Sequence, residues 1–320
     1  SVVTELGNLG ITVLNPGGDV NAQYVTSAES RTIWVQLDQT SFTTLFGPDA
    51  ALRLATDGDD EFLFWEGNLN LPEPIAAAGV KGLWFDTGYL EHTVTADPGA
   101  GKGVVLPDGA QSPGNSASSV LYPNEIAALY NFPFADPDLW QSVRTGTVGL
   151  VESGIGSALP HHATASFDEL LAAYRALAGI TAPLPHVATV AGGGQTYSDS
   201  GERSLDVGVV TAINPNSKLV LYAGSGSANG AGSDSFTAYQ SAIWDTVHDI
   251  DVLSSSDKSF PNVAAGSPFL FALEELFVDA ALRNITVVNS VGDGGSGNQY
   301  ANGLTNVSAM HANQYALAIG

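Results

Sequence analysis

The chain has 320 residues, enough for two domains, and 44% of them are hydrophobic, so a large core is possible. It contains no cysteine, which excludes disulfides and thiolate zinc sites. Its 33 acidic and 10 basic residues give a net charge of −23, which disfavours nucleic acid and anionic lipid as partners. No stretch approaches the roughly 20 apolar residues that span a bilayer. Such acidity fits adaptation to acid or to high salt, and it also fits ordinary solubility.

Residues 92–121 are dominated by Gly, Pro, Ser and Ala and show no periodic apolar pattern. This composition predicts an exposed, flexible linker. The linker divides a first unit, residues 1–91, from a larger second unit, residues 122–320.

The first unit has the pattern of an α+β fold. Helices are expected over 2–9, over 40–46 with Thr40 or Ser41 as the cap, and over 74–80, where Pro74 opens the helix. Strands are expected over 11–14, 32–37 and 61–65. No catalytic constellation is visible in this unit, which favours a folding or inhibitory module.

The second unit alternates strands and helices. The strands are expected over 147–151, 186–191, 218–223, 251–254, 285–290 and 315–319, and the helices over 168–177 with Ser166 as the cap, 202–213, 236–247 and 268–282. Six such strands with crossover helices predict a doubly wound parallel α/β sheet, and their Val, Ile and Leu runs fit strands buried on both faces.

In a sheet of this kind the active site lies beyond the carboxyl ends of the strands. The residues that follow the predicted strands are therefore the first candidates for a site. They are Glu152 and residues 192–194, 224–226, 254–257 and 292–297.

Glu202 and Asp206 are four residues apart on a predicted helix, so their carboxyl groups share one face. Leu205, Val209 and Ile213 indicate a neighbouring apolar stripe, which places the pair beside the core. Two adjacent carboxyl groups resist double ionisation and can act as a base in acid, where histidine is already charged. An acidic helical turn on a solvated face is the alternative.

Asp293 lies in a glycine-rich segment, residues 292–296, directly after a predicted strand. Glycines permit a substrate to approach the backbone closely. A protonated Asp293 could donate a hydrogen bond to an oxyanion. The alternative is an ordinary Asp-Gly turn.

Together these residues resemble the sedolisins, the serine-carboxyl peptidases. Four segments carry the resemblance in order: the later part of the family's propeptide (residues 6–14, 65–67, 71–72 and 80–84), the start of its catalytic domain (122–133), its Glu/Asp helix (201–207, GERSLDV) and its second signature (290–296, SVGDGGS). The likeness covers residues 1–90 and 122–320.

The resemblance implies a subtilisin-like doubly wound sheet preceded by a ferredoxin-like α+β propeptide. It implies a Ser-Glu-Asp triad in a secreted, acid-acting endopeptidase that cleaves polypeptides. Glu202 is then the general base and acid, Asp206 orients it, and Asp293 serves the oxyanion hole. Glu152 extends the hydrogen-bond network or is a buried structural residue.

The substrate cleft is expected to involve Gly292 and the serines Ser254, Ser255 and Ser256. Residues 254–257 stand where many relatives carry Ser-Trp-Gly-Gly, so the resemblance does not define the shape of this cleft.

The family's nucleophile lies in a downstream Gly-Thr-Ser motif, which this chain lacks. We therefore expect a C-terminal polypeptide, either a second chain or a continuation of this one beyond residue 320, to supply the nucleophilic serine and the family's calcium ligands, and the first unit to act as the inhibitor. A catalytically dead relative that binds or supports other molecules is the main alternative. The sequence lacks the glycine-rich fingerprint of dinucleotide-binding enzymes, which disfavours that function. A metal site at His161 and His162 is disfavoured because no carboxylate stands at a matching spacing.

Overall fold

The computed structural model describes eleven segments of the chain. They are residues 1–19, 24–57, 60–86, 121–132, 145–152, 167–182, 187–190, 201–225, 235–256, 266–290 and 313–319.

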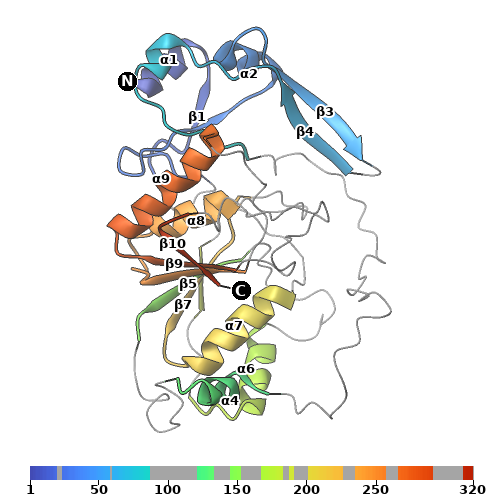
Figure 1. The fold of residues 1–320 in the computed structure, drawn as a ribbon, viewed down its shortest axis with the longest axis vertical. Coiled ribbons are helices and arrows are strands. Elements are labelled where there is room, and N and C mark those ends of the chain that lie inside the picture. Colours follow the sequence, from blue (N-terminus) through green and yellow to red (C-terminus); the bar gives the residue numbers. More distant parts are fainter. Residues whose placement is uncertain are drawn as a thin grey trace.

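The larger part of the molecule is built on a six-stranded sheet in which every strand pair is parallel (Figure 1). Its spatial order is β10-β9-β8-β5-β7-β6. The strands are β5 (Thr147–Val151), β6 (Val187–Val190), β7 (Lys218–Tyr222), β8 (Val252–Ser255), β9 (Thr286–Ser290) and β10 (Ala316–Ile319). Within this sheet the chain starts at the central strand β5, adds β7 and β6 on one side of it, and then crosses to β8 on the other side. The order of the strands therefore reverses at β5, the position where such sheets form a crevice.

Side chains of the central strands alternate between two buried faces, as the twofold period of a strand requires. On β7, Val220 and Tyr222 belong to one core cluster, whereas Leu219 and Leu221 belong to another. All four side chains are at most 3% exposed. The predicted continuous apolar runs are thus explained by a sheet covered on both sides.

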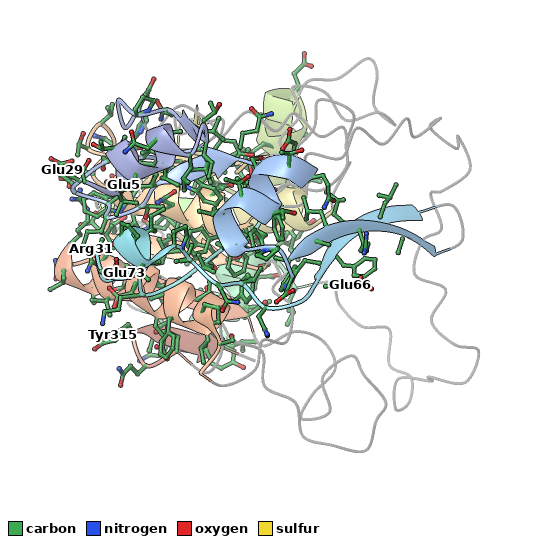
Figure 2. The ribbon with its side chains drawn as sticks, turned by 90° about the horizontal axis from the view of Figure 1, so that it is seen from above. Glu5, Glu29, Arg31, Glu66, Glu73 and Tyr315 are labelled. Carbon is green, nitrogen blue, oxygen red and sulfur yellow. The ribbon has the colours of Figure 1, made fainter. Side chains whose placement is uncertain are left out.

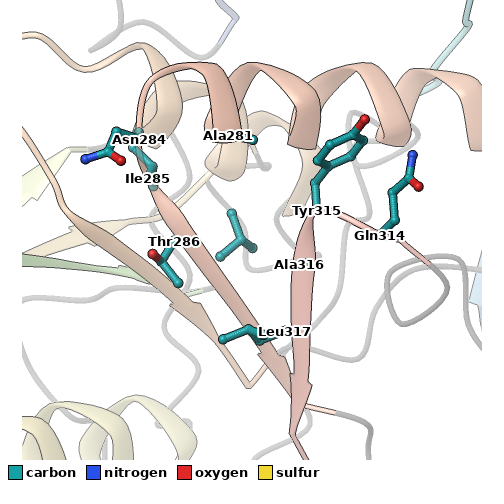
Figure 3. Close-up of a pocket in the computed structure, with 9 residues that line it drawn as sticks. Ala281, Asn284, Ile285, Thr286, Gln314, Tyr315, Ala316 and Leu317 are labelled. Atoms are coloured by element: carbon teal, nitrogen blue, oxygen red, sulfur yellow. The ribbon is translucent and has the colours of Figure 1, made fainter.

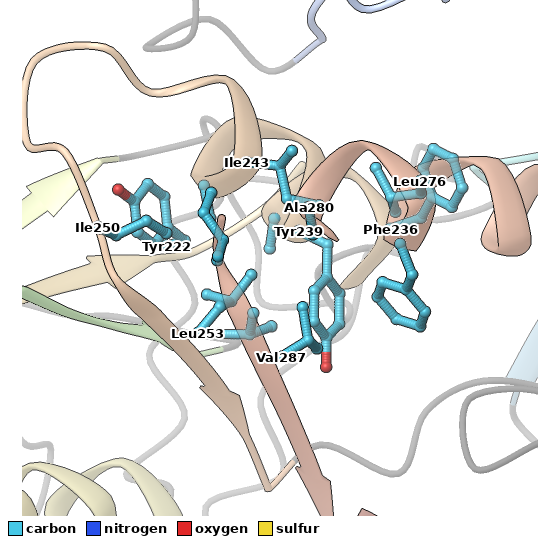
Figure 4. Packing of buried hydrophobic residues seen from close by; sticks show 14 of the residues in the cluster. Tyr222, Phe236, Tyr239, Ile243, Ile250, Leu253, Leu276, Ala280 and Val287 are labelled. Carbon is cyan, nitrogen blue, oxygen red and sulfur yellow. The ribbon is translucent and has the colours of Figure 1, made fainter. Parts of the chain in front are cut away.

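Helices cover each face. On one side lie α8 (Ser235–Trp244) and α9 (Pro268–Leu282), whose Tyr239 and Phe277 are fully buried against the sheet (Figure 4). On the other side lie α6 (Phe167–Leu177) and α7 (Gly201–Ile213), with α4 (Pro123–Leu129) packed on α7. The result is a three-layer α/β arrangement, as the sequence predicts.

The first unit contains α1 (Val2–Asn8), β1 (Thr12–Leu14), β2 (Trp34–Gln36), α2 (Gln39–Phe46), β3 (Ala51–Asp57), β4 (Asp60–Glu66) and α3 (Glu73–Ala76). Its strands form two separate antiparallel pairs, β1-β2 and β3-β4. An α+β unit is present, but the ferredoxin-like form is not confirmed, because that form has a single four-stranded sheet.

Most predicted elements agree with the structure to within one to three residues, and β5 and α9 have the predicted bounds. Three details were wrong. Asp38 caps α2 rather than Thr40 or Ser41, because its carboxylate accepts the amide of Ser41 at 2.8 Å. Two elements, β3 and α4, were not predicted. The predicted linker 92–121 lies outside the described residues except for Leu121.

The first unit packs against α8 and α9. The indole of Trp34 donates to Gln240 at 2.7 Å, and Trp84 stacks on Phe236 with ring centroids 4.9 Å apart. A side chain at Gly82 would collide with the backbone of Ala272, since an added Cβ would lie 2.5 Å from its nitrogen. The contact is therefore close-packed.

Charged groups also join the two parts. Arg31, labelled in Figure 2, pairs with Glu275 at 3.0 Å and with the mostly buried Asp279, both on α9. Burial raises the pKa of Asp279 above its ordinary value, and the neighbouring Arg31 opposes that rise.

We expect Leu253→Ala to lower the free energy of unfolding by about 2 to 5 kcal/mol, because Leu253 is fully buried between the sheet and its helices. Chemical denaturation of the purified chain measures this loss. Leu177→Ala is the matched control, since Leu177 is 70% exposed and its truncation should change stability little. Equal losses in the two variants would contradict the described core.

Candidate active site

Three side chains meet at the carboxyl edge of the sheet, beside the point where the strand order reverses. Glu152 directly follows β5, Ser256 directly follows β8, and Asp206 projects from α7. The Ser256 hydroxyl lies 3.0 and 2.8 Å from the two carboxyl oxygens of Asp206. Glu152 also makes a side-chain hydrogen bond to Asp206. Residues separated by up to 104 positions in the sequence are thus brought into one cluster.

The cluster holds Asp206 in a largely water-excluded position. Burial raises the pKa of Asp206 above its ordinary value of 3.8, while the hydrogen bonds from Ser256 and Glu152 lower it in part. Two carboxyl groups can share a hydrogen bond only if one of them carries a proton. The Glu152–Asp206 contact is therefore a site where a proton can be held and exchanged, as acid–base chemistry requires.

The strand β5 delivers Glu152 to this position because its amide continues the sheet, donating to the carbonyl of Tyr222 at 2.9 Å. Glu152 is 3% exposed. A carboxyl group this deeply buried needs hydrogen-bonding partners. The expectation that Glu152 either extends the hydrogen-bond network or is a buried structural residue stays a prediction.

Helix α7 directs Asp206 toward the sheet because the next residue, Val207, is fully buried with Leu171 and Leu219. The apolar stripe predicted from Leu205, Val209 and Ile213 was wrong at Leu205, which is 56% exposed. The face that packs runs instead through Val207, Val210 and Thr211. Asp206 borders this face, whereas the expectation that the Glu202–Asp206 pair lies beside the core stays a prediction.

The neighbouring strand ends are rigidly held. Ser255 pairs in register with Val151 of β5 and Asn289 of β9. The hydroxyl of the fully buried Tyr239 donates to Asn289 at 2.5 Å. The predicted cleft serines 254–256 thus lie in a fixed strand end, and of the three Ser256 contacts Asp206.

The last described residue of the first unit, Asp86, reaches the same edge of the sheet. Its carboxylate accepts hydrogen bonds from Tyr24 at 2.8 Å and from Ser225, which lies just beyond β7. Ser225 is fully buried. The first unit therefore covers part of the edge at which the candidate site lies. No sequence pattern indicated this contact, because neither residue belongs to a recognisable motif.

Several predicted positions are not placed by the structure. Glu202 lies in the first turn of α7, but its side chain is outside the described residues, and so are Gly292, Asp293, residues 192–194 and the His161–His162 pair. Within the described parts of the chain, no three His, Cys, Asp or Glu side chains gather in a way that could hold a metal ion. No helix in these parts has the length and hydropathy needed to cross a membrane.

Two cavities lie away from the cluster. One of about 330 Å³ opens between the end of α9 and the amino ends of β9 and β10, opposite to the carboxyl edge (Figure 3). The other, of about 1110 Å³, lies between the first unit and α9. Neither is lined by Glu152, Asp206 or Ser256.

The raised pKa of Asp206 predicts an effect on stability. A carboxyl group whose pKa is raised by folding favours the folded state most below its ordinary pKa of 3.8, and this contribution is lost as the pH rises through the raised value. Asp206→Asn removes this pH-dependent loss of stability, because an amide side chain does not ionise. We expect the stability of the variant relative to the wild type to be greatest at neutral pH and to decline in acid. Thermal unfolding at several pH values measures this, with the exposed Asp49→Asn as control. A pH-independent difference would contradict the prediction.

Comparison with known proteins gives one sequence match. No protein-family model matches the chain. Over 212 residues it is 28% identical to kumamolisin from Bacillus sp. (strain MN-32), covering 64% of this chain and 35% of that protein. A structure of Pseudomonas sedolisin, a serine-carboxyl proteinase complexed with two molecules of pseudo-iodotyrostatin, aligns at a TM-score of 0.45 and 22% identity, over 64% of this chain and 54% of that one. The chain thus spans about a third of the length of kumamolisin, and over the matched residues this similarity supports a relationship to the sedolisin family.

Proposed function

We propose that this chain forms the acid–base half of a serine-carboxyl endopeptidase with a subtilisin-like sheet. The observation that carries the proposal is the Glu152–Asp206–Ser256 cluster at the carboxyl edge of the sheet, with Asp206 one helical turn after Glu202. The similarity to kumamolisin supports a peptidase family. The substrate is then a polypeptide.

In the proposed mechanism, Glu202 takes the proton of a serine hydroxyl as its oxygen attacks the peptide carbonyl carbon. Asp206 orients Glu202, and Glu152 extends the network that holds the proton. A protonated Asp293 donates a hydrogen bond to the developing oxyanion. Glu202 then passes its proton to the leaving amine, and water releases the acyl group by the reverse sequence.

This chemistry suits acid conditions. Histidine is charged below its pKa of about 6.5 and cannot accept a proton there, whereas a carboxyl network keeps a base available at lower pH. The net charge of −23 fits the same conditions, because protonation of carboxylates in acid reduces the repulsion between them.

The nucleophilic serine belongs, in this proposal, to a C-terminal polypeptide outside the 320 residues. Secretion and a calcium ion bound by that second polypeptide are further parts of the proposal, and the resemblance to the sedolisins alone supports them. We assign no calcium ligand and no catalytic step to calcium within this chain.

The first unit acts as an inhibitor. The contact of Asp86 with Ser225 supports this, because it places the end of the first unit over the carboxyl edge where a substrate would bind.

Glu202→Gln in the complete protein should lower kcat by about 10²- to 10⁴-fold, because an amide cannot accept the serine proton. Peptide hydrolysis measured in acid tests this loss. Glu274→Gln on α9, away from the cluster, is the matched control and should retain activity. Near-normal turnover of the Glu202 variant would contradict the assignment of Glu202 as the general base. An inactive wild-type protein would favour the alternative of a catalytically dead relative.

Acid should weaken the hold of the first unit on α9. The pair between Arg31 and Asp279 exists only while Asp279 is ionised, and burial raises the pKa of Asp279, so the pair is lost at a higher pH than an exposed aspartate would allow. After cleavage at a protease site inserted within residues 92–121, gel filtration should show the first unit retained at neutral pH and released in acid.

Arg31→Ala is the companion variant in that experiment. It should release the first unit more readily at neutral pH, and its difference from the wild type should shrink in acid. Equal retention of the first unit at all pH values would count against this prediction.

A further inference from the structure

The hydroxyl of Ser256 lies close to both carboxyl oxygens of Asp206, at 3.0 and 2.8 Å. Both separations are within hydrogen-bond range for an O–H donor and a carboxyl oxygen. A group that contacts both oxygens restricts rotation of the carboxyl plane, whereas a contact to one oxygen leaves that rotation freer. The geometry of this contact is therefore suited to orienting Asp206.

Ser256 is well placed to act as a fixed support. It directly follows β8, a strand hydrogen-bonded to β5 on one side and to β9 on the other. The preceding Ser255 is 2% exposed. The support therefore comes from the rigid centre of the sheet, while Asp206 comes from a helix packed on its face.

We propose that Ser256 is a positioning residue that fixes the orientation of the Asp206 carboxyl group for the acid–base network, and that it does not act through contact with the substrate. This inference rests on the proposed function, since Asp206 must orient Glu202 for Ser256 to affect the reaction. It differs from the expectation that Ser256 lines the substrate cleft, because the hydroxyl is engaged by Asp206.

Two side chains contact Asp206 in this arrangement, and a further titratable residue is close to it in the sequence. Glu152 approaches from the end of β5, Ser256 from the end of β8, and Glu202 lies one turn earlier on the same helix. Ser256 is the contacting group that carries no carboxyl group of its own, and its hydrogen bond to the ionised form of Asp206 favours that form. Loss of the hydroxyl should therefore shift the titration of Asp206 upward.

The first test uses the 320-residue chain and needs no peptidase activity. Carbon-13 NMR of labelled aspartate carboxyl groups, with Asp206 assigned from Asp206→Asn, follows the Asp206 titration directly. Ser256→Ala should raise the pKa of Asp206, and Ser256→Thr, which keeps a hydroxyl, should restore it toward the wild-type value. An unchanged titration in the alanine variant overturns the proposal.

A control uses a buried serine near α7. The Ser217 side chain, 1% exposed, donates to the carbonyl of Asn214 at 2.9 Å in the turn beyond the carboxyl end of α7. Ser217→Ala also removes a hydrogen-bonded serine hydroxyl and should leave the Asp206 titration unchanged. If Ser217→Ala shifts it equally, the effect is a general loss of stability and the proposal fails. Should Ser256→Ala not fold, Ser256→Cys, with its weak donor, replaces it.

The second test measures peptide hydrolysis by the complete protein. Ser256→Ala should lower kcat by roughly 10- to 100-fold, move the acid limb of the pH profile to higher pH and leave KM unchanged. A rise in KM with kcat unchanged indicates a substrate contact and overturns the proposal. If the titration shifts as expected but the wild-type protein is inactive, the Ser256–Asp206 contact stands and the peptidase function fails.

Discussion

The reversal of strand order at β5 is the constraint on which the rest of the arrangement depends. Because β7 and β8 leave this strand on opposite sides, their connecting helices lie on opposite faces and leave a crevice at the carboxyl edge. Glu152 directly follows the central strand β5 at this crevice, and Ser256 follows the neighbouring strand β8. Asp206 comes from helix α7, which packs on one face of the sheet. A carboxyl cluster can be buried here because each strand end supplies a hydrogen-bonding partner without breaking the sheet.

The same constraint explains how much the sequence could predict. Apolar runs bounded by polar residues located β5 and α9 with their observed bounds, since such runs are buried whatever their neighbours. By contrast, β3 contains Arg53 and polar residues near its end, and its strand form depends on pairing with β4. No local pattern contains that pairing.

The sequence predicted that the candidate residues lie at the carboxyl edge of the sheet, but it did not predict which of them contact one another. The carboxyl-end rule placed Glu152 and the 254–257 segment together, and the i, i+4 spacing placed Asp206 near Glu202. Helix α7 carries apolar residues on more than one side, so periodicity could not tell whether Leu205 or Val207 faces the core. The Ser256–Asp206 contact joins residues 50 positions apart and depends on how α7 sits on the sheet, which the sequence does not encode locally.

The close approach at Gly82 has a consequence for how the two parts of the chain can be separated. The space between this glycine and Ala272 is too small for any side chain, so every larger residue at position 82 acts as a wedge between the first unit and α9. A substitution at position 82 leaves the charges of Arg31 and its partners unchanged. Position 82 is thus a place where the size of a side chain alone can weaken the association of the two parts, without a change in the charges of the Arg31 ion pairs. Substitutions of graded size there would open the joint by steps at constant pH.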